Sequence, residues 1–95
     1  MVTVRRLVID VLKPHDPPLL EFTRQLGKTE GVDAISSTLI ELDQEVQNVK
    51  ITLEGEDLAY EAVESAVETL GGTVHSVDEV ACGDYVVEHR PTPQD

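Results

Sequence analysis

The sequence predicts an α+β fold of six elements in the order strand, helix, strand, strand, helix, strand. Two observations lead to this order: runs rich in Val, Leu and Ile alternate with segments of helical spacing, and each helical segment ends at glycine. A third is the short polar turn Asp43 to Glu45 between the two middle strands. This order is the ferredoxin-like βαββαβ sandwich, with a four-stranded antiparallel sheet and two helices on one face.

The first half of the chain gives a strand over residues 2–12 and then a helix. Alternation divides the strand into an apolar face, with Leu7, Ile9 and Val11, and a second face that carries Arg6, Val8 and Asp10. Asp16 before Pro17 and Pro18 predicts the start of the helix, because a side-chain acceptor precedes a backbone already set for the first turn. The inward positions of this helix are Leu19, Phe22 and Leu26.

The second half gives a hairpin from residues 34–42 and 47–53, then a helix that Asp57 is expected to cap. The expected inward positions of this helix are Leu58, Ala62, Ala66 and Leu70. Gly71 and Gly72 end it, and residues 73–81 form the last long strand. We therefore expect one domain over residues 1–83 and a C-terminal extension over residues 84–95, in which residues 85–87 form a short edge strand before a flexible tail.

The net charge of the chain argues against some classes of binding partner. The 95 residues include 19 acidic and 7 basic side chains, a net charge of -12, which repels nucleic acid and anionic membranes. Because the acids are dispersed along the chain, they favour the solvating surface of a halophilic protein over a cation-binding tract. A single Cys and the lack of a secretion signal predict a reducing, cytoplasmic setting.

Two groups of polar residues are candidate sites. In the predicted topology one end of the sheet gathers imidazole and carboxylate groups that suit zinc, calcium or magnesium, although polar loops also collect such residues by chance: His15, Asp16, Asp43, Glu45 and His75. The sheet face without helices carries a second group: Arg6, Asp10, Lys50, Glu54 and Asp78. That group is either a ladder of cross-strand ion pairs, Arg6 with Glu54 or Asp78 and Lys50 with Asp10, or a subunit interface or cation site.

Catalytic signatures are nearly absent from the sequence. Cys82 follows an apolar run without a neighbouring base, which predicts a buried or inert thiol. The serines lack the glycine pattern of a nucleophile elbow, and three aromatic residues are too few for a base-stacking platform.

Four strings in the sequence resemble an archaeal family known as domain of unknown function 211. They are residues 5–15 (RRLVIDVLKPH), 30–33 (EGVD), 48–55 (NVKITLEG) and 70–80 (LGGTVHSVDEV). The resemblance implies an archaeal, and with this acidity haloarchaeal, protein with a ferredoxin-like fold. Members of that family are described as associating into closed, ring-like oligomers, and no activity is established for it. The matching strings contain the candidate metal ligands Asp10, His15, His75, Asp78 and Glu79.

Three functions remain open at this point. The leading one is a non-enzymatic, homo-oligomeric binding or regulatory module that associates through its open sheet face or sheet edge, with Arg6, Asp10, Lys50 and Glu54 as interface residues. The alternative is a protein that binds a divalent cation (Ca²⁺, Mg²⁺ or Zn²⁺) through the candidate ligands. The third is a small enzyme with a His15/His75 acid-base pair.

Overall fold

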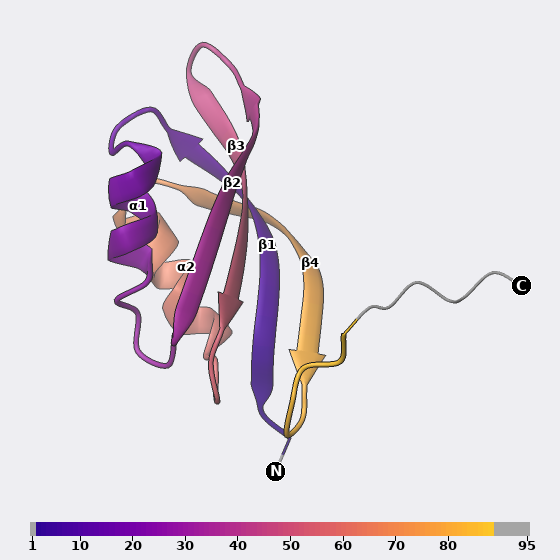
Figure 1. Cartoon of the computed structure of the whole chain (residues 1–95). Helices are drawn as coiled ribbons and strands as arrows, with labels where there is room; N and C mark the ends of the chain where they lie inside the picture. Colours follow the sequence, from indigo (N-terminus) through magenta and orange to yellow (C-terminus); the bar gives the residue numbers. More distant parts are fainter. Residues whose placement is uncertain (1, 89–95) are drawn as a thin grey trace, which may run out of the picture.

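The computed structural model, which describes residues 2–88, confirms the ferredoxin-like α+β arrangement (Figure 1). The strands are β1 (Val4–Pro14), β2 (Ala34–Leu42), β3 (Val46–Glu54) and β4 (Thr73–Cys82), and the helices are α1 (Leu19–Leu26) and α2 (Tyr60–Thr69). The sheet has the order β2-β3-β1-β4, and each neighbouring pair is antiparallel. β1 and β3 are therefore central, while β2 and β4 form the two edges.

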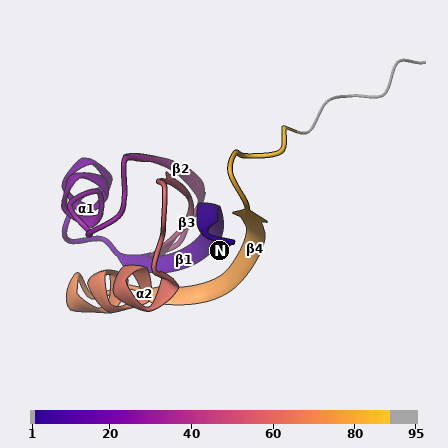
Figure 2. The ribbon, with the colours of Figure 1, turned by 90° about the horizontal axis from the view of Figure 1, so that it is seen from below.

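The hydrophobic core lies between the central strands and the two helices, which share one side of the sheet (Figure 2). Its sheet side consists of the odd-numbered residues of β1 and β3: Leu7, Ile9, Val11, Val49, Ile51 and Leu53. The helix side comes from Phe22 and Leu26 of α1, Val63 and Val67 of α2, and Leu58 before α2. No helix within residues 2–88 is long and apolar enough to cross a membrane.

Both helices begin later than the sequence predicts. The N-cap of α1 is Pro18 and that of α2 is Ala59, and neither helix start has a side-chain capping bond. Asp16 and Asp57 lie two residues upstream of these positions, too far to accept from the first free N–H groups. The helices are therefore held by packing on the sheet rather than by caps.

The inward face of α2 also differs from the prediction. Val63 and Val67 are fully buried, whereas Ala62, Ala66 and Leu70 lie at the margin of the core. The β-branched side chains Val63 and Val67 thus occupy the centre of the helix–sheet contact. The expected edge strand over residues 85–87 does not form, and the part of the predicted extension after residue 88 lies outside the described residues.

The core face of β1 ends in a charged residue, Lys13, which is completely buried. Its Nζ donates to the Pro14 carbonyl oxygen at 2.7 Å and to Gln47 Oε1 at 3.0 Å, and it lies 5.6 Å from the centre of the Phe22 ring. Loss of hydration lowers the pKa of Lys13, an effect that the charge of Asp16 partly opposes. The ammonium is thus stabilised by oxygen dipoles and a π face.

The Lys13→Met variant should keep the packing at this position and remove the contribution of Lys13 to the pH dependence of the free energy of unfolding. Because the pKa of Lys13 is lower in the folded than in the unfolded chain, the unfolded chain binds more protons, and native stability rises with pH toward the unfolded pKa. Urea unfolding from neutral to pH ~10 should therefore show the wild type gaining stability relative to Lys13→Met. If the free energies of unfolding of Lys13→Met and wild type changed equally with pH, a lowered pKa of Lys13 in the folded chain would be contradicted.

Candidate functional site

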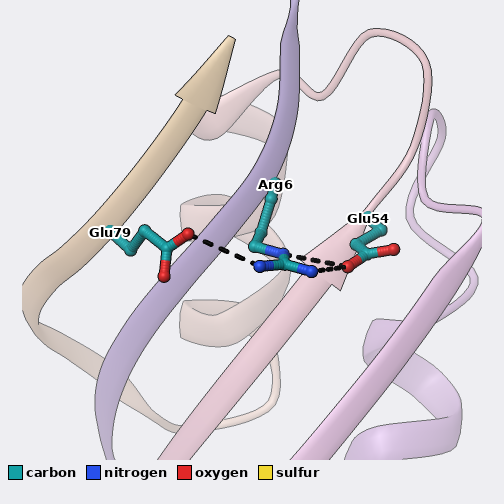
Figure 3. A network of polar contacts seen from close by, with 3 residues as sticks. All are labelled: Arg6, Glu54 and Glu79. Atoms are coloured by element: carbon teal, nitrogen blue, oxygen red, sulfur yellow. Dashed lines mark hydrogen bonds and ion pairs between the residues drawn. The ribbon is translucent and has the colours of Figure 1, made fainter. Parts of the chain in front are cut away.

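An ion-pair network crosses the sheet face opposite the helices (Figure 3). Arg6 of β1 donates to Glu54 Oε2 of β3 from Nε at 2.9 Å and from Nη2 at 2.6 Å, and its Nη1 lies 3.6 Å from Glu79 Oε2 of β4. The hydrogen bond to Glu54 raises the pKa of Arg6, so the guanidinium stays charged. One side chain thereby links three of the four strands.

The Arg6–Glu54 pair was predicted from the sequence, but the partner on β4 is Glu79 rather than Asp78. β4 changes register against β1 between the pairs Val8–Glu79 and Ile9–Val77, which leaves Asp78 as the extra residue of a bulge. Asp78 Oδ1 instead accepts a hydrogen bond from Ser76 Oγ at 2.7 Å. Alternation alone does not reveal the bulge, because one inserted residue reverses the face of the residues that follow it.

Asp10 lies on the same face, in the middle of β1. It is directly opposite Lys50 in the register, yet the exposed Lys50 forms no salt bridge with it within residues 2–88. The Oδ1 atom of Asp10 is inaccessible to solvent and has no hydrogen-bond partner, and the same holds for Oδ1 of Asn48, on the same face of β3. The face therefore contains two buried oxygen acceptors without donors.

The residues predicted to meet at one end of the sheet are only partly brought together. His15 Nε2 lies 2.9 Å from the carbonyl oxygen of Asp43, which attaches the loop after β1 to the tip of the β2–β3 hairpin. His75 lies on β4 beside the level of Asp10 and Val11, roughly 15 Å along the strand direction from His15 at 3.3 Å per residue. Within residues 2–88 no three His, Cys, Asp or Glu side chains are placed to hold one metal ion.

The outer edge of β2 is a feature that the prediction of sites did not single out. β2 contains no charged residue from Ala34 to Ile40, and its end exposes Leu39, Ile40 and Leu42 by 42%, 56% and 63%. The tip of the β2–β3 hairpin borders a pocket of about 420 Å³. Its lining residues are Leu12, Glu41, Leu42, Asp43, Val46 and Asn48. The signal was present in the sequence as an uncharged stretch in an otherwise highly charged chain.

The opposite edge, β4, is also incompletely covered. Val77 and Val80 lie across from the core residues Ile9 and Leu7 and so face the helix side, but they are 43% and 53% exposed. Cys82, which was expected to be buried or inert, is exposed at the end of this strand. The helix layer therefore leaves part of each edge strand uncovered.

Comparison with known families agrees with the strings noted in the sequence. The model of the DUF211 family, described as "Uncharacterized ArCR", matches residues 5–95. The chain belongs to the DUF211 family. It is also similar to the uncharacterized protein MJ0319 of Methanocaldococcus jannaschii, with 41% identity over 92 residues that cover 97% of this chain and 95% of the relative. This DUF211 chain thus resembles an archaeal protein along nearly its whole length.

The two glutamates that hold Arg6 should contribute unequally to stability. Glu54 accepts two short hydrogen bonds, whereas Glu79 makes a longer contact, so Glu54→Gln should lower the free energy of unfolding by about 1 kcal/mol and Glu79→Gln by less than about half of that. Chemical denaturation at low and high salt measures both values. The difference between them should shrink in high salt, because the pairs are partly exposed. A larger loss for Glu79→Gln would contradict the geometry.

Proposed function

We propose that this DUF211 chain is a non-catalytic binding module that works as a homo-oligomer and associates through the edges of its sheet. The closed oligomers that the family resemblance implies agree with this role. The separation of His15 and His75 along the sheet gives no support to the acid-base enzyme.

The observation that carries the proposal is the uncharged edge of β2. Soluble proteins usually protect an exposed edge strand with Lys, Pro, inward charges or a covering segment. Between Ala34 and Ile40 β2 contains no charged residue and no Pro, and residues 2–88 provide no further strand along this edge. Its protective features are Glu41 and the change of register between Leu39 and Glu41. Its free backbone groups and exposed Leu39 and Ile40 are therefore available to another strand.

The distribution of charge favours the β2 edge as the surface where a second copy of the chain binds. Two chains that each carry a charge of -12 repel one another over most of their surfaces. The stretch from Ala34 to Ile40 is one surface where two copies can approach without bringing carboxylates together. Association should therefore strengthen as salt screens the remaining charge.

A carboxylate placed at the β2 edge should dissociate the oligomer. The wild-type chain should have a mass that is a multiple of 10.4 kDa by light scattering after gel filtration in high salt. Leu39→Glu should weaken association about 30-fold or more, because burial of the charge costs at least ~2 kcal/mol. Leu20→Glu is the matched control, since Leu20 is 70% exposed on α1 and belongs to neither edge strand. A wild-type chain that is monomeric at micromolar concentration contradicts the proposal.

Binding of a divalent cation is the second candidate, and the unpartnered oxygens of Asp10 and Asn48 favour it. Carboxylate and amide oxygens are the donors that Ca²⁺ and Mg²⁺ prefer, and a cation bound there would supply the missing partner. Of the candidate ligands, Asp10 fits this role best: His15 is bonded to a backbone oxygen, Asp78 to Ser76, and Glu79 lies beside Arg6.

A cation site at Asp10 predicts stabilisation by the metal. After treatment with a chelator, addition of Ca²⁺ or Mg²⁺ at 100 times its Kd should raise the free energy of unfolding by about 2.7 kcal/mol. Asp10→Asn should abolish the rise in melting temperature, whereas Asp16→Asn, in the exposed loop, should leave it unchanged. A melting temperature that does not respond to Ca²⁺, Mg²⁺ or Zn²⁺ contradicts the second candidate and leaves the first untouched.

A further inference from the structure

The β2–β3 hairpin projects beyond both helices and forms one wall of the pocket of about 420 Å³ at its tip (Figure 1). A row of directly opposed residues lines this pocket on the face without helices: Leu12 of β1, Asn48 of β3 and Glu41 of β2. Opposed residues in adjacent strands have Cα atoms about 5 Å apart, so neighbouring side chains of the row can contact one another. One chain supplies every lining residue.

A bulge in β2 places the carboxylate in this row. β2 pairs regularly with β3 up to Leu39 and Val49, and the next pair is Glu41 with Asn48, so Ile40 is an extra residue. Without the bulge Ile40 would lie opposite Asn48, and Glu41 would lie on the other face of the sheet. The bulge therefore gives the pocket an acidic side chain in place of an apolar one.

Two side chains of the pocket lack donors as partners. Asn48 Oδ1 is inaccessible to solvent and has no hydrogen-bond partner, and Glu41 forms no ion pair within residues 2–88. No Lys, Arg or His from the described part of the chain lines the pocket. Since carboxylate and amide oxygens both accept hydrogen bonds, this pair selects a ligand that carries N–H donors and a positive charge.

The other walls of the pocket favour a ligand with an apolar body. Leu12, Leu42 and Val46 make up half of the lining residues, and Leu42 and Val46 are 63% and 37% exposed. The volume of about 420 Å³ lies within the range of small-molecule sites, roughly 300 to 1,000 Å³, and is far larger than a bare metal ion needs. An organic cation would cover these side chains, whereas a bare ion would leave them in water.

Contacts outside the pocket hold its walls in place. His15 Nε2 lies 2.9 Å from the carbonyl oxygen of Asp43, which fixes the hairpin tip to the loop after β1. On the helix side of the sheet, the buried Lys13 donates from Nζ to Gln47 Oε1 at 3.0 Å and so fixes the part of β3 that lines the pocket. Walls that are already held lose little conformational entropy when a ligand binds.

We propose that this pocket binds a small organic cation, in which a primary ammonium or guanidinium group is joined to a short apolar chain. The cationic group donates to Glu41 and to Asn48 Oδ1, once the side chain of Asn48 turns toward the ligand. The chain of the ligand lies against the apolar walls. The inference adds a ligand to the proposed binding module and does not depend on self-association, because the whole pocket belongs to one chain.

Titration of the ¹⁵N-labelled full-length chain with n-butylammonium, followed through the chemical shifts of the backbone amides, tests the pocket. The amides of residues 41–43 and 46–48 should shift and saturate with a Kd of about 1 mM, the order expected for a ligand of so few atoms. n-Butylguanidinium should shift the same amides. 1-Butanol and butyrate, which have a similar chain without the positive charge, should bind at least about 10-fold more weakly.

Glu41→Gln should weaken binding of n-butylammonium about 10-fold, because it removes the carboxylate of the pocket. Glu45→Gln is the matched control and should change the Kd less than about 2-fold, since it removes the same charge from the same hairpin outside the pocket. Both side chains are exposed, so both variants should keep the fold.

Equal weakening by the two variants would mean attraction to the net charge alone and would overturn the inference. Equal binding of 1-butanol would also overturn it, as would Ca²⁺ that shifts these amides at lower concentration than the ammonium. A monomeric chain that binds n-butylammonium in the pocket contradicts the proposed oligomer and supports the inference. An oligomer in which none of these amides shifts contradicts the inference and leaves the proposed self-association standing.

Discussion

The structure depends on a mismatch of size between its two layers. The helices have 8 and 10 residues and are about 12 and 15 Å long, whereas the strands have 9 to 11 residues and reach about 30 to 36 Å. Each helix can therefore cover only part of the length of the strands: α1 contacts β2 and α2 contacts β4, and the fully buried core residues of the sheet lie on β1 and β3. The exposed apolar residues of β2 and β4 follow from this constraint.

Charged side chains stabilise the parts of the sheet that the helices do not cover. On the face without helices, Arg6 joins β1 to Glu54 and Glu79 of its two neighbours and so replaces the apolar packing that this face lacks. At the end of β1, Lys13 lies beside Phe22, at the margin of the covered area. These two groups of polar contacts complete the sheet around a small core.

The order of the six elements and the strand faces could be predicted, because the alternation of β1 and β3 is regular and the helices end at glycine. The burial of Lys13 was not predicted, because the expected strand ended at residue 12, whereas β1 extends to Pro14 and Lys13 continues the alternation of Ile9 and Val11. The bulge at Asp78 was not predicted, since no residue type in the sequence marks the position where the register of β4 against β1 shifts. The centre of α2 was misjudged because a helix of Ala and Val has two faces of similar hydrophobicity, and packing on the sheet decides between them.

The position of β1 also sets the order of events in folding. The first strand of the chain lies at the centre of the sheet, where Arg6 pairs with Glu54 of β3 and Val4 with Cys82 of β4. Contacts so distant in sequence require closure of long loops before they contribute free energy, which slows folding. A nascent chain on the ribosome would hold β1 with one side unpaired until β4 emerges. The sheet should therefore be completed only late in synthesis, and β1 would need protection from aggregation until then.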